Sequence, residues 1–305
     1  MDHMSIEALP NALQLGPITI PLYGLMIMTG VLFALLMGIM EGKKIGIKSN
    51  DIIDGLLIIL PIAILGARLW YVIFEWSSFS DYLPSIIGFN RDGSFSGFQG
   101  LAIHGGFFAA LIAAYIYTKK RKMDIFKTLD LVAPGFLIGQ TFGRWGNFFN
   151  QEAHGGVIGG TTNGTVNLGW DAQRSFLTNT LNLPKFITDN MFINGPDGYN
   201  YYHPTFLYES LWNIVGIVFV LIIRRMKFIR SGDLLAFYLI WYSIGRFMIE
   251  AMRTDSLYVW GTGLRTAQIT SIAMILAGII LIIFNHIIIK RKHYTKSLEE
   301  NSVQS

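Results

Sequence analysis

Several arginines and carboxylates of this chain lie inside or against apolar segments, a combination suited to holding an anion at a membrane. The densest group occupies residues 143–152, GRWGNFFNQE, where a hydrophobic run ends in an arginine, two asparagines and a glutamate. A charge within the bilayer costs about 2.5–3.5 kcal/mol on insertion scales, so it persists only where another group compensates it. The rigid fork of donors on arginine matches a phosphate. The sequence therefore indicates a polar site for an anion such as a phosphate.

The same chemistry recurs around residue 246. Tyr242, Arg246, Glu250 and Arg253 are separated by four, four and three positions, so they are predicted to share one face of a helix. Such a stripe cannot face lipid, and we expect it to face the interior of a helix bundle. Glu250 can compensate one arginine, which would leave the others available for an anion.

Other polar residues stand where apolar segments begin or end. They are Tyr23, Arg68, His104, Asn147, Asn150, Glu152, His203 and Glu209. A lone arginine near a span end often extends to the interface, so Arg68 by itself fits an interfacial residue as well as a ligand. His104 precedes Gly105 and Gly106, which would let a ligand approach the backbone, and it is interpreted as functional.

These residues need a membrane scaffold to position them. Hydrophobic residues make up 52% of the 305 positions, charged residues make up 14%, and mean hydropathy is +0.44, which argues against a soluble globule. About 20 apolar residues cross the hydrocarbon core, and seven stretches approach that length. They lie at about 22–40, 52–74, 101–117, 129–148, 205–223, 234–252 and 267–289. We expect an all-α polytopic membrane protein with seven transmembrane helices, in which residues 1–305 form a single membrane domain.

The basic residues predict the orientation. Lysines and arginines gather in the loops after the first, third, fifth and seventh spans, and such loops favour the cytoplasm. The N-terminus is then outside, the C-terminus is cytoplasmic, and residues 75–99 and 150–204 are external. The second of these segments should form a small folded cap, because an unstructured loop of that length would be unusual. The polar residues fall near the outer ends of the spans and the inner halves carry almost nothing polar, which predicts one electropositive cavity open to the outer leaflet.

Composition also limits partners and cofactors. The chain contains no cysteine, which excludes disulfides, thiolate metal sites and a thiol nucleophile of its own. Neither a metal site nor a cofactor is predicted. The net charge of +4 needs no nucleic-acid partner, because topology and attraction to anionic membrane lipid account for the basic loops.

Five short motifs follow one another along the chain. Tyr-Gly-Leu stands at 23–25, Ile-His-Gly-Gly at 103–106, and the decapeptide at 143–152 is followed by Gly155. His-Pro-Thr at 203–205 precedes Leu-Tyr-Glu at 207–209, and Tyr-Ser-Ile-Gly-Arg at 242–246 precedes Glu250, Arg253 and Asp255. In this order, over nearly the whole chain, they resemble the bacterial prolipoprotein diacylglyceryl transferase family. Residues 156–200 carry no motif that can be transferred.

The resemblance implies an activity and its partners. Members of this family move the diacylglyceryl group of phosphatidylglycerol to the thiol of the lipobox cysteine in a prolipoprotein and release glycerol 1-phosphate, the first step of lipoprotein maturation. The expected partners are phosphatidylglycerol, a prolipoprotein lipobox peptide and membrane lipid, with no cofactor. The expected location is the bacterial cytoplasmic membrane, with the active site toward the outer leaflet.

Matching positions also suggest roles. The expected catalytic residues are His104, Arg144, Tyr242 and Arg246: the two arginines would hold the phosphate and His104 would take the thiol proton. An arginine-rich field that lowers the thiol pKa is the alternative to a histidine base. The expected substrate-binding residues are Tyr23, Arg68, Asn147, Asn150, Glu152, Gly155, His203, Glu209, Glu250 and Arg253.

Other functional classes fit the sequence less well. An anion transporter or channel would need polar residues at the midplane or along a path to the cytoplasm, which the apolar inner halves disfavour. A sensor or scaffold would bind anionic lipid without turnover. An intramembrane protease is disfavoured because the sequence lacks paired intramembrane aspartates and the Gly-x-Ser-x-Gly and His-Glu-x-x-His motifs.

Overall fold

The computed structural model describes residues 11–16, 18–94, 97, 100–259 and 263–294, and it is mostly helical. The chain divides into two compact units. One is formed by Met1–Met37 with Leu129–Glu299, and the other by Gly38–Thr128 with Glu300–Ser305. Arg68 and His104 belong to the second unit, whereas the other predicted site residues belong to the first.

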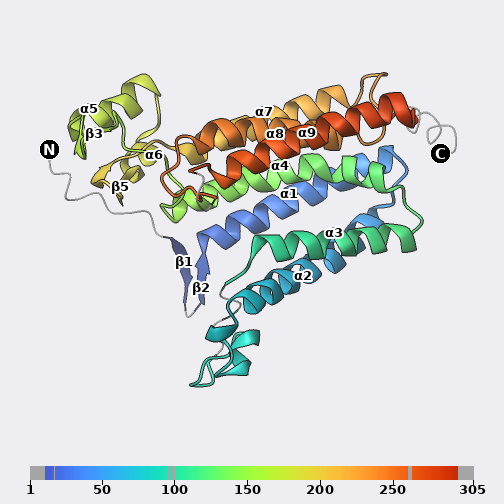
Figure 1. The fold of residues 1–305 in the computed structure, drawn as a ribbon, viewed down its shortest axis with the longest axis horizontal. Coiled ribbons are helices and arrows are strands. Elements are labelled where there is room, and N and C mark those ends of the chain that lie inside the picture. The colour runs from blue at the N-terminus through green and yellow to red at the C-terminus, as the bar shows by residue number, and fades with distance from the viewer. Residues whose placement is uncertain (1–10, 17, 95–96, 98–99, 260–262, 295–305) are drawn as a thin grey trace. The chain divides into compact units, whose positions relative to one another are not determined.

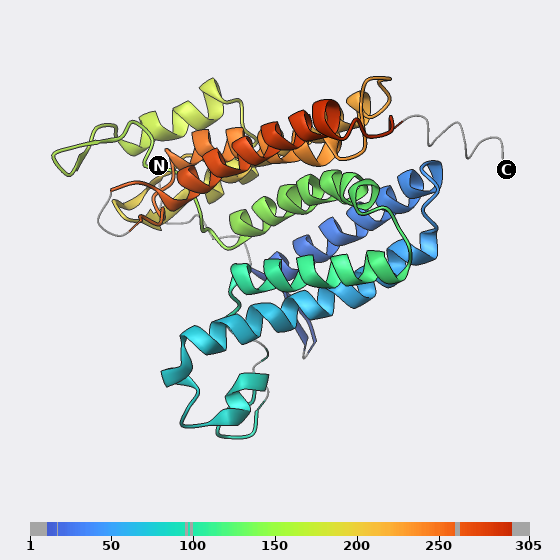
Figure 2. The same cartoon turned by 45° about the vertical axis from the view of Figure 1, so that its right-hand side comes forward.

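The long helices of the first unit run side by side (Figures 1 and 2). They are the first part of α1 (Leu22–Lys44), α4 (Ile125–Phe149), α7 (Thr205–Ile223), α8 (Asp233–Glu250) and α9 (Thr266–Ile283), which continues into a π-helical turn at Phe284–Ile288. A short hairpin, β1 (Ala12–Leu15) with β2 (Ile18–Pro21), precedes α1.

Four helices in the described part of the chain are long and apolar enough to cross a membrane. They are Leu22–Lys44, Ser49–Phe74, Thr205–Ile223 and Thr266–Ile288. The chain is therefore a mostly helical membrane protein. The other three expected spans are also helical, as α3 (Ile103–Lys120), α4 and α8, but they carry more polar and charged residues.

A reciprocal tryptophan pair joins α7 and α8. The rings of Trp212 and Trp241 stack with centroids 4.4 Å apart, and each indole N–H donates to the backbone carbonyl of the other residue, at 2.8 and 3.0 Å. Gly245 faces Trp212 and Gly216 faces Trp241, where an added Cβ would lie 2.4 and 2.5 Å from the indole. Glycine at these two positions lets the helices approach closely. The pair therefore fixes the position of α8 against α7.

Residues 150–204, called here the cap segment, form short helices and hairpins (Figure 1) that share a buried hydrophobic cluster. The segment contains two hairpins, β3–β4 (Thr161–Thr162, Thr165–Val166) and β5–β6 (Phe192–Gly195, Gly198–Tyr201), and the helices α5 (Trp170–Ser175), Phe176–Thr180 and α6 (Lys185–Asn190). The buried cluster includes Phe148 from α4 and Phe206 from α7. The cap segment is thereby fixed on the adjoining ends of these two helices.

In the second unit, α2 (Ser49–Phe74) packs closely against α3. A Cβ at Gly66 would lie 2.2 Å from the Cβ of Ala109, and one at Gly105 would lie 2.4 Å from the carbonyl oxygen of Gly66. The space beside Gly105 is therefore filled by α2. Our interpretation of this glycine as room for a ligand was wrong, because helix packing accounts for it.

Buried polar groups join the helix ends of the first unit that lie away from the cap segment. Asp130 accepts hydrogen bonds from the backbone N–H of Gly232, at 2.6 Å, and of Leu235, at 2.9 Å, which caps the N-terminus of α8. Asp233 accepts from Asn285 at 3.0 Å and lies 2.7 Å from Nε2 of His286. If this end is the inner one, as the sequence analysis expects, these residues are exceptions to its otherwise nearly apolar inner halves. These groups bind one another and the N-terminus of α8, so they have a structural role in joining the helix ends.

Candidate active site

Glu209 of α7 lies between three arginines. Its Oε2 is 2.8 Å from Nε of Arg144 on α4, and its Oε1 is 3.4 Å from Nη1 of Arg246 on α8. The same Oε1 is 3.9 Å from Nη1 of Arg253, which follows the end of α8. Glu209 is 5% exposed, so solvent screens these attractions weakly. One carboxylate therefore brings together guanidinium groups from separate segments, as the sequence predicted for Arg144 and Arg246.

Two further carboxylates balance this group. Glu250 places Oε2 2.6 Å from Nη2 of Arg246, which is the i,i+4 contact that the spacing predicts. Asp255 binds Arg253 with both oxygens, at 2.8 Å to Nε and 2.5 Å to Nη2. We expected Glu250 to compensate one arginine and to leave the others available for an anion. The structure instead pairs each arginine of the cluster with a carboxylate.

Asp255 is the most accessible of these carboxylates. Its side chain is 48% exposed, against 6% for Glu209 and 2% for Glu250. Burial by itself would raise the pKa of Asp255, but the hydrogen bonds and the positive charge of Arg253 outweigh burial and hold this pKa below its ordinary value. Asp255 is therefore ionised at neutral pH and restrains Arg253.

A chain of amides extends from Arg144 into the turn after α4. Nη1 of Arg144 donates to Oδ1 of Asn147 at 3.2 Å, and Nδ2 of Asn147 donates to Oε1 of Glu152 at 2.9 Å. Asn150 donates to the same Glu152 oxygen at 3.3 Å. Gln151 adopts a left-handed conformation, with φ of 52°, and the turn brings Glu152 back toward Asn147. The motif at 143–152 thus forms one hydrogen-bonded unit.

Tyr23 approaches the same turn of α4. It is the second residue of α1, and its ring packs on Gly146, where an added Cβ would lie 2.7 Å from Cδ2 of the ring. Any larger residue at position 146 would displace the tyrosine. Gly146 therefore admits an aromatic residue within one helical turn of Arg144 and Asn147.

Backbone contacts join the start of the cap segment to its end. The N–H of Gly155 donates to the carbonyl of His203 at 2.9 Å, and the N–H of His203 donates to Gly156 at 3.0 Å. Gly155 also forms an antiparallel bridge with Arg253, and an added Cβ would lie 2.8 Å from Cβ of His203. Nδ1 of His203 is 3.3 Å from the hydroxyl of Tyr208. Burial lowers the pKa of His203, so its imidazole is neutral at pH 7.

Tyr242 lies one turn of α8 before Arg246. It is half-buried, and its ring stacks on Tyr238 with centroids 5.8 Å apart. The hydroxyl of Tyr238 accepts a hydrogen bond from Gln140 at 2.9 Å. These contacts fix the ring plane of Tyr242, and its role in the reaction stays a prediction.

Arg68 and His104 are described within the second unit. The guanidinium of Arg68 donates to three backbone carbonyls, of Ser85 at 2.5 Å, Ile86 at 2.8 Å and Gly100 at 3.2 Å. Arg68 therefore holds the loop that includes the 3-10 helices Trp76–Ser78 and Leu83–Ile87, and substrate binding by it stays a prediction. His104 is the second residue of α3 and is exposed; its role as a base also stays a prediction.

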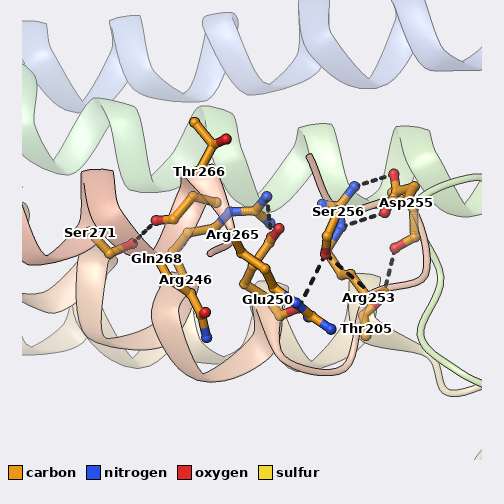
Figure 3. A network of polar contacts seen from close by, with 12 residues as sticks. Thr205, Arg246, Glu250, Arg253, Asp255, Ser256, Arg265, Thr266, Gln268 and Ser271 are labelled. Atoms are coloured by element: carbon orange, nitrogen blue, oxygen red, sulfur yellow. Dashed lines mark hydrogen bonds and ion pairs between the residues drawn. The ribbon is translucent and has the colours of Figure 1, made fainter. Parts of the chain in front are cut away.

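Arg265 is a member of the polar network that the sequence analysis did not single out. It flanks the start of α9, and its guanidinium donates to the backbone carbonyl of Glu250 (Figure 3). Ser256 Oγ donates to the same carbonyl at 3.4 Å. Both donors satisfy the carbonyl end of α8 and hold the backbone beside the Glu250 carboxylate. A basic residue that caps a helix from a later segment leaves no spacing signal in the sequence.

Comparison with known proteins identifies the family. The family model described as prolipoprotein diacylglyceryl transferase matches residues 10–284. This chain belongs to the prolipoprotein diacylglyceryl transferase family. It is 45% identical over 275 residues to the phosphatidylglycerol–prolipoprotein diacylglyceryl transferase of Bacillus velezensis, which covers 90% of this chain and 91% of the relative. The enzyme of that name from Bacillus mycoides is 45% identical over 272 residues, covering 89% and 90%, and that from Bacillus cereus strain G9842 is 44% identical over 272 residues.

Membership of the diacylglyceryl transferase family confirms the resemblance drawn from the five motifs. The matched residues include most of both compact units and the whole cap segment. The arginine–carboxylate cluster, the amide chain after α4 and the exposed His104 therefore all lie within the part of the chain that the family shares.

Proposed function

We propose that this chain moves the diacylglyceryl group of phosphatidylglycerol to the lipobox cysteine of prolipoproteins. Family membership over residues 10–284 supports a transferase of this class, and the names of the relatives specify phosphatidylglycerol and prolipoprotein. The structural observation that carries the proposal is the convergence of Arg144, Arg246 and Arg253 on Glu209. Guanidinium groups gathered in a membrane protein are suited to the phosphate of a lipid.

The reaction exchanges a carbon–oxygen bond for a carbon–sulfur bond. The cysteine sulfur of the peptide attacks the glyceryl carbon that carries the phosphate, the carbon–oxygen bond breaks, and glycerol 1-phosphate leaves with the bonding electron pair. The thiol proton passes to a base. Negative charge grows on the leaving phosphate, and we assign its stabilisation to Arg144 and Arg246. A preorganised donor of this kind contributes about 3–4 kcal/mol in other enzymes.

The remaining predicted residues fit supporting roles. The linked side chains of Asn147, Asn150 and Glu152 offer amide donors and carboxylate acceptors to the glycerol headgroup. His104 is assigned as the base, because its side chain is exposed at the start of α3 and a ring nitrogen of a neutral imidazole can accept a proton. The lack of cysteine in this chain is no obstacle, because the sulfur arrives with the peptide.

The membrane arrangement is part of the proposal. We assign seven membrane-crossing helices, an external N-terminus, a cytoplasmic C-terminus and an active site toward the outer leaflet of the bacterial cytoplasmic membrane. The cap segment and residues 75–99 are then external parts of one membrane domain spanning residues 1–305. The basic loops support this orientation, and so does a site that must meet a peptide already transported across the membrane.

Purified protein in lipid nanodiscs tests the activity. With phosphatidylglycerol and a synthetic lipobox peptide, we expect the peptide to gain the mass of one diacylglyceryl group and glycerol 1-phosphate to appear in equal amount. Phosphatidylethanolamine in place of phosphatidylglycerol, or a peptide with serine in place of the lipobox cysteine, should give no product. Phosphatidylglycerol binding without a mass change would favour a lipid sensor. Uptake of labelled phosphate into protein-containing vesicles would favour a transporter.

A further inference from the structure

We propose that Glu209 is a positioning residue for lipid transfer rather than a ligand of the substrate, and that its carboxylate sets the spacing of the arginines that receive the phosphate. This inference rests on the proposed function, and it is an alternative to the substrate-binding role that the sequence suggested for Glu209.

Both oxygens of Glu209 are engaged by protein. Oε2 faces Arg144, and Oε1 faces Arg246 and Arg253, at 2.8, 3.4 and 3.9 Å. With 5% of its surface exposed, Glu209 offers little area to a lipid headgroup or a peptide. Its position is fixed by α7, which the reciprocal tryptophan pair holds against α8.

Glu209 also joins segments that the neighbouring carboxylates do not join. Among the ion pairs of the described residues, Glu250 pairs with Arg246, which is on its own helix, and Asp255 pairs with Arg253, two residues away. Glu209 alone among these three acids contacts Arg144, which α4 carries. The distance between Arg144 and the arginines at the end of α8 is therefore set through Glu209.

The negative charge of Glu209 allows a positioning role to be distinguished from a substrate-binding role. A carboxylate repels a phosphate that approaches the same guanidinium groups, so Glu209 opposes lipid binding while it fixes the arrangement of its partners. Removing its charge but not its shape should therefore leave phosphatidylglycerol affinity unchanged or increased. Turnover should fall, because misplacement of a catalytic group by about 1 Å costs about 100-fold in rate.

The test compares Glu209→Gln, Glu209→Asp and a matched control, Glu41→Gln. Glu41 is also a buried glutamate on a helix, and it pairs with Lys44 at 2.7 Å in the second unit. Initial rates are measured with a lipobox peptide in nanodiscs of dioleoylphosphatidylglycerol diluted in phosphatidylcholine. For Glu209→Gln we expect kcat to fall on the order of 100-fold with the KM for phosphatidylglycerol unchanged or lower. Glu209→Asp keeps the charge and should recover part of kcat, and Glu41→Gln should match the wild type.

Other outcomes overturn the inference. A raised KM for phosphatidylglycerol with unchanged kcat in Glu209→Gln would show that Glu209 binds substrate. Kinetics of Glu209→Gln equal to those of Glu41→Gln would show that it positions nothing. Thermal unfolding in detergent shows whether Glu209→Gln is folded. If it is not, Glu209→Asp provides the test: a lower kcat with unchanged KM supports positioning, and a raised KM with unchanged kcat supports substrate binding. Failure of the wild type to modify the peptide would instead overturn the proposed function.

Discussion

At the scale of single residues, Arg144 carries two contacts that require a planar side chain. Its Nε lies 2.8 Å from Glu209 and its Nη1 donates to Asn147 at 3.2 Å. These acceptors lie on different helices, and the fork of the guanidinium reaches both. A lysine has one nitrogen on a flexible stem and cannot reproduce two directed contacts. We therefore expect the shape of the Arg144 side chain, and not only its positive charge, to be required for transfer.

Arg144→Lys should consequently inactivate the protein although it preserves the charge. We expect the rate of diacylglyceryl transfer to fall about 100-fold or more, the scale at which loss of one preorganised donor acts. The matched control is Arg174→Lys in the cap segment, where Nη2 pairs with Asp189 at 2.8 Å; a partly exposed pair of this kind contributes little, so its rate should stay close to wild type. Mass analysis of the lipobox peptide measures both. An active Arg144→Lys variant would contradict the geometric role.

At the scale of helices, contacts within one helix could be predicted from the sequence, whereas contacts that depend on helix packing could not. The Arg246–Glu250 pair follows from spacing alone, because residues four apart meet on a helix. The position of Glu209 between the arginines depends on how α7 packs on α8, which is set by glycines and tryptophans whose pairing no local pattern reveals. Gly105 was misinterpreted for the same reason: a glycine that admits a helix and one that admits a ligand look alike in sequence.

The packing of α7 on α8 can be tested at Gly245. An added Cβ would lie 2.4 Å from the indole of Trp212, and hydrogen bonds to and from Trp241 hold that indole. Gly245→Ala should therefore destabilise the protein by about 1–3 kcal/mol and reduce transfer, because Arg246 is the next residue. Thermal unfolding in detergent and the transfer assay measure the two effects.

Gly139 provides the control for this prediction. It lies within α4, and an added Cβ there would meet nothing within 4 Å. Gly139→Ala should leave stability unchanged or slightly increased, since alanine favours a helix. Equal stability of the two alanine variants would show that the tryptophan pair does not restrict the approach of α7 and α8.

At the scale of the whole molecule, the site is useful only if it faces the side where prolipoproteins emerge. The ends of α4 and α8 and the start of α7, which carry the arginine–carboxylate cluster, are the ends to which the cap segment is attached. At the opposite end, Asp130 accepts a hydrogen bond from Gly232 and Asp233 accepts one from Asn285. Because the cluster lies at the end that carries the cap segment, we expect substrates to reach it from that side, and the side of the membrane on which the cap segment lies can be tested.

The absence of cysteine from the chain allows this sidedness to be measured directly. Single cysteines replace exposed residues: Ser80 and Thr162 on the expected outer side, Lys120 and Lys227 on the expected inner side. The bacterial cells keep an intact cytoplasmic membrane, and any barrier outside it is removed. A membrane-impermeant maleimide should then label Ser80→Cys and Thr162→Cys. Lys120→Cys and Lys227→Cys should react only after the cytoplasmic membrane is permeabilised. The cysteine-free parent is the control for background labelling. Protection of Thr162→Cys until permeabilisation would place the cap segment in the cytoplasm, where the cluster could not meet a transported peptide.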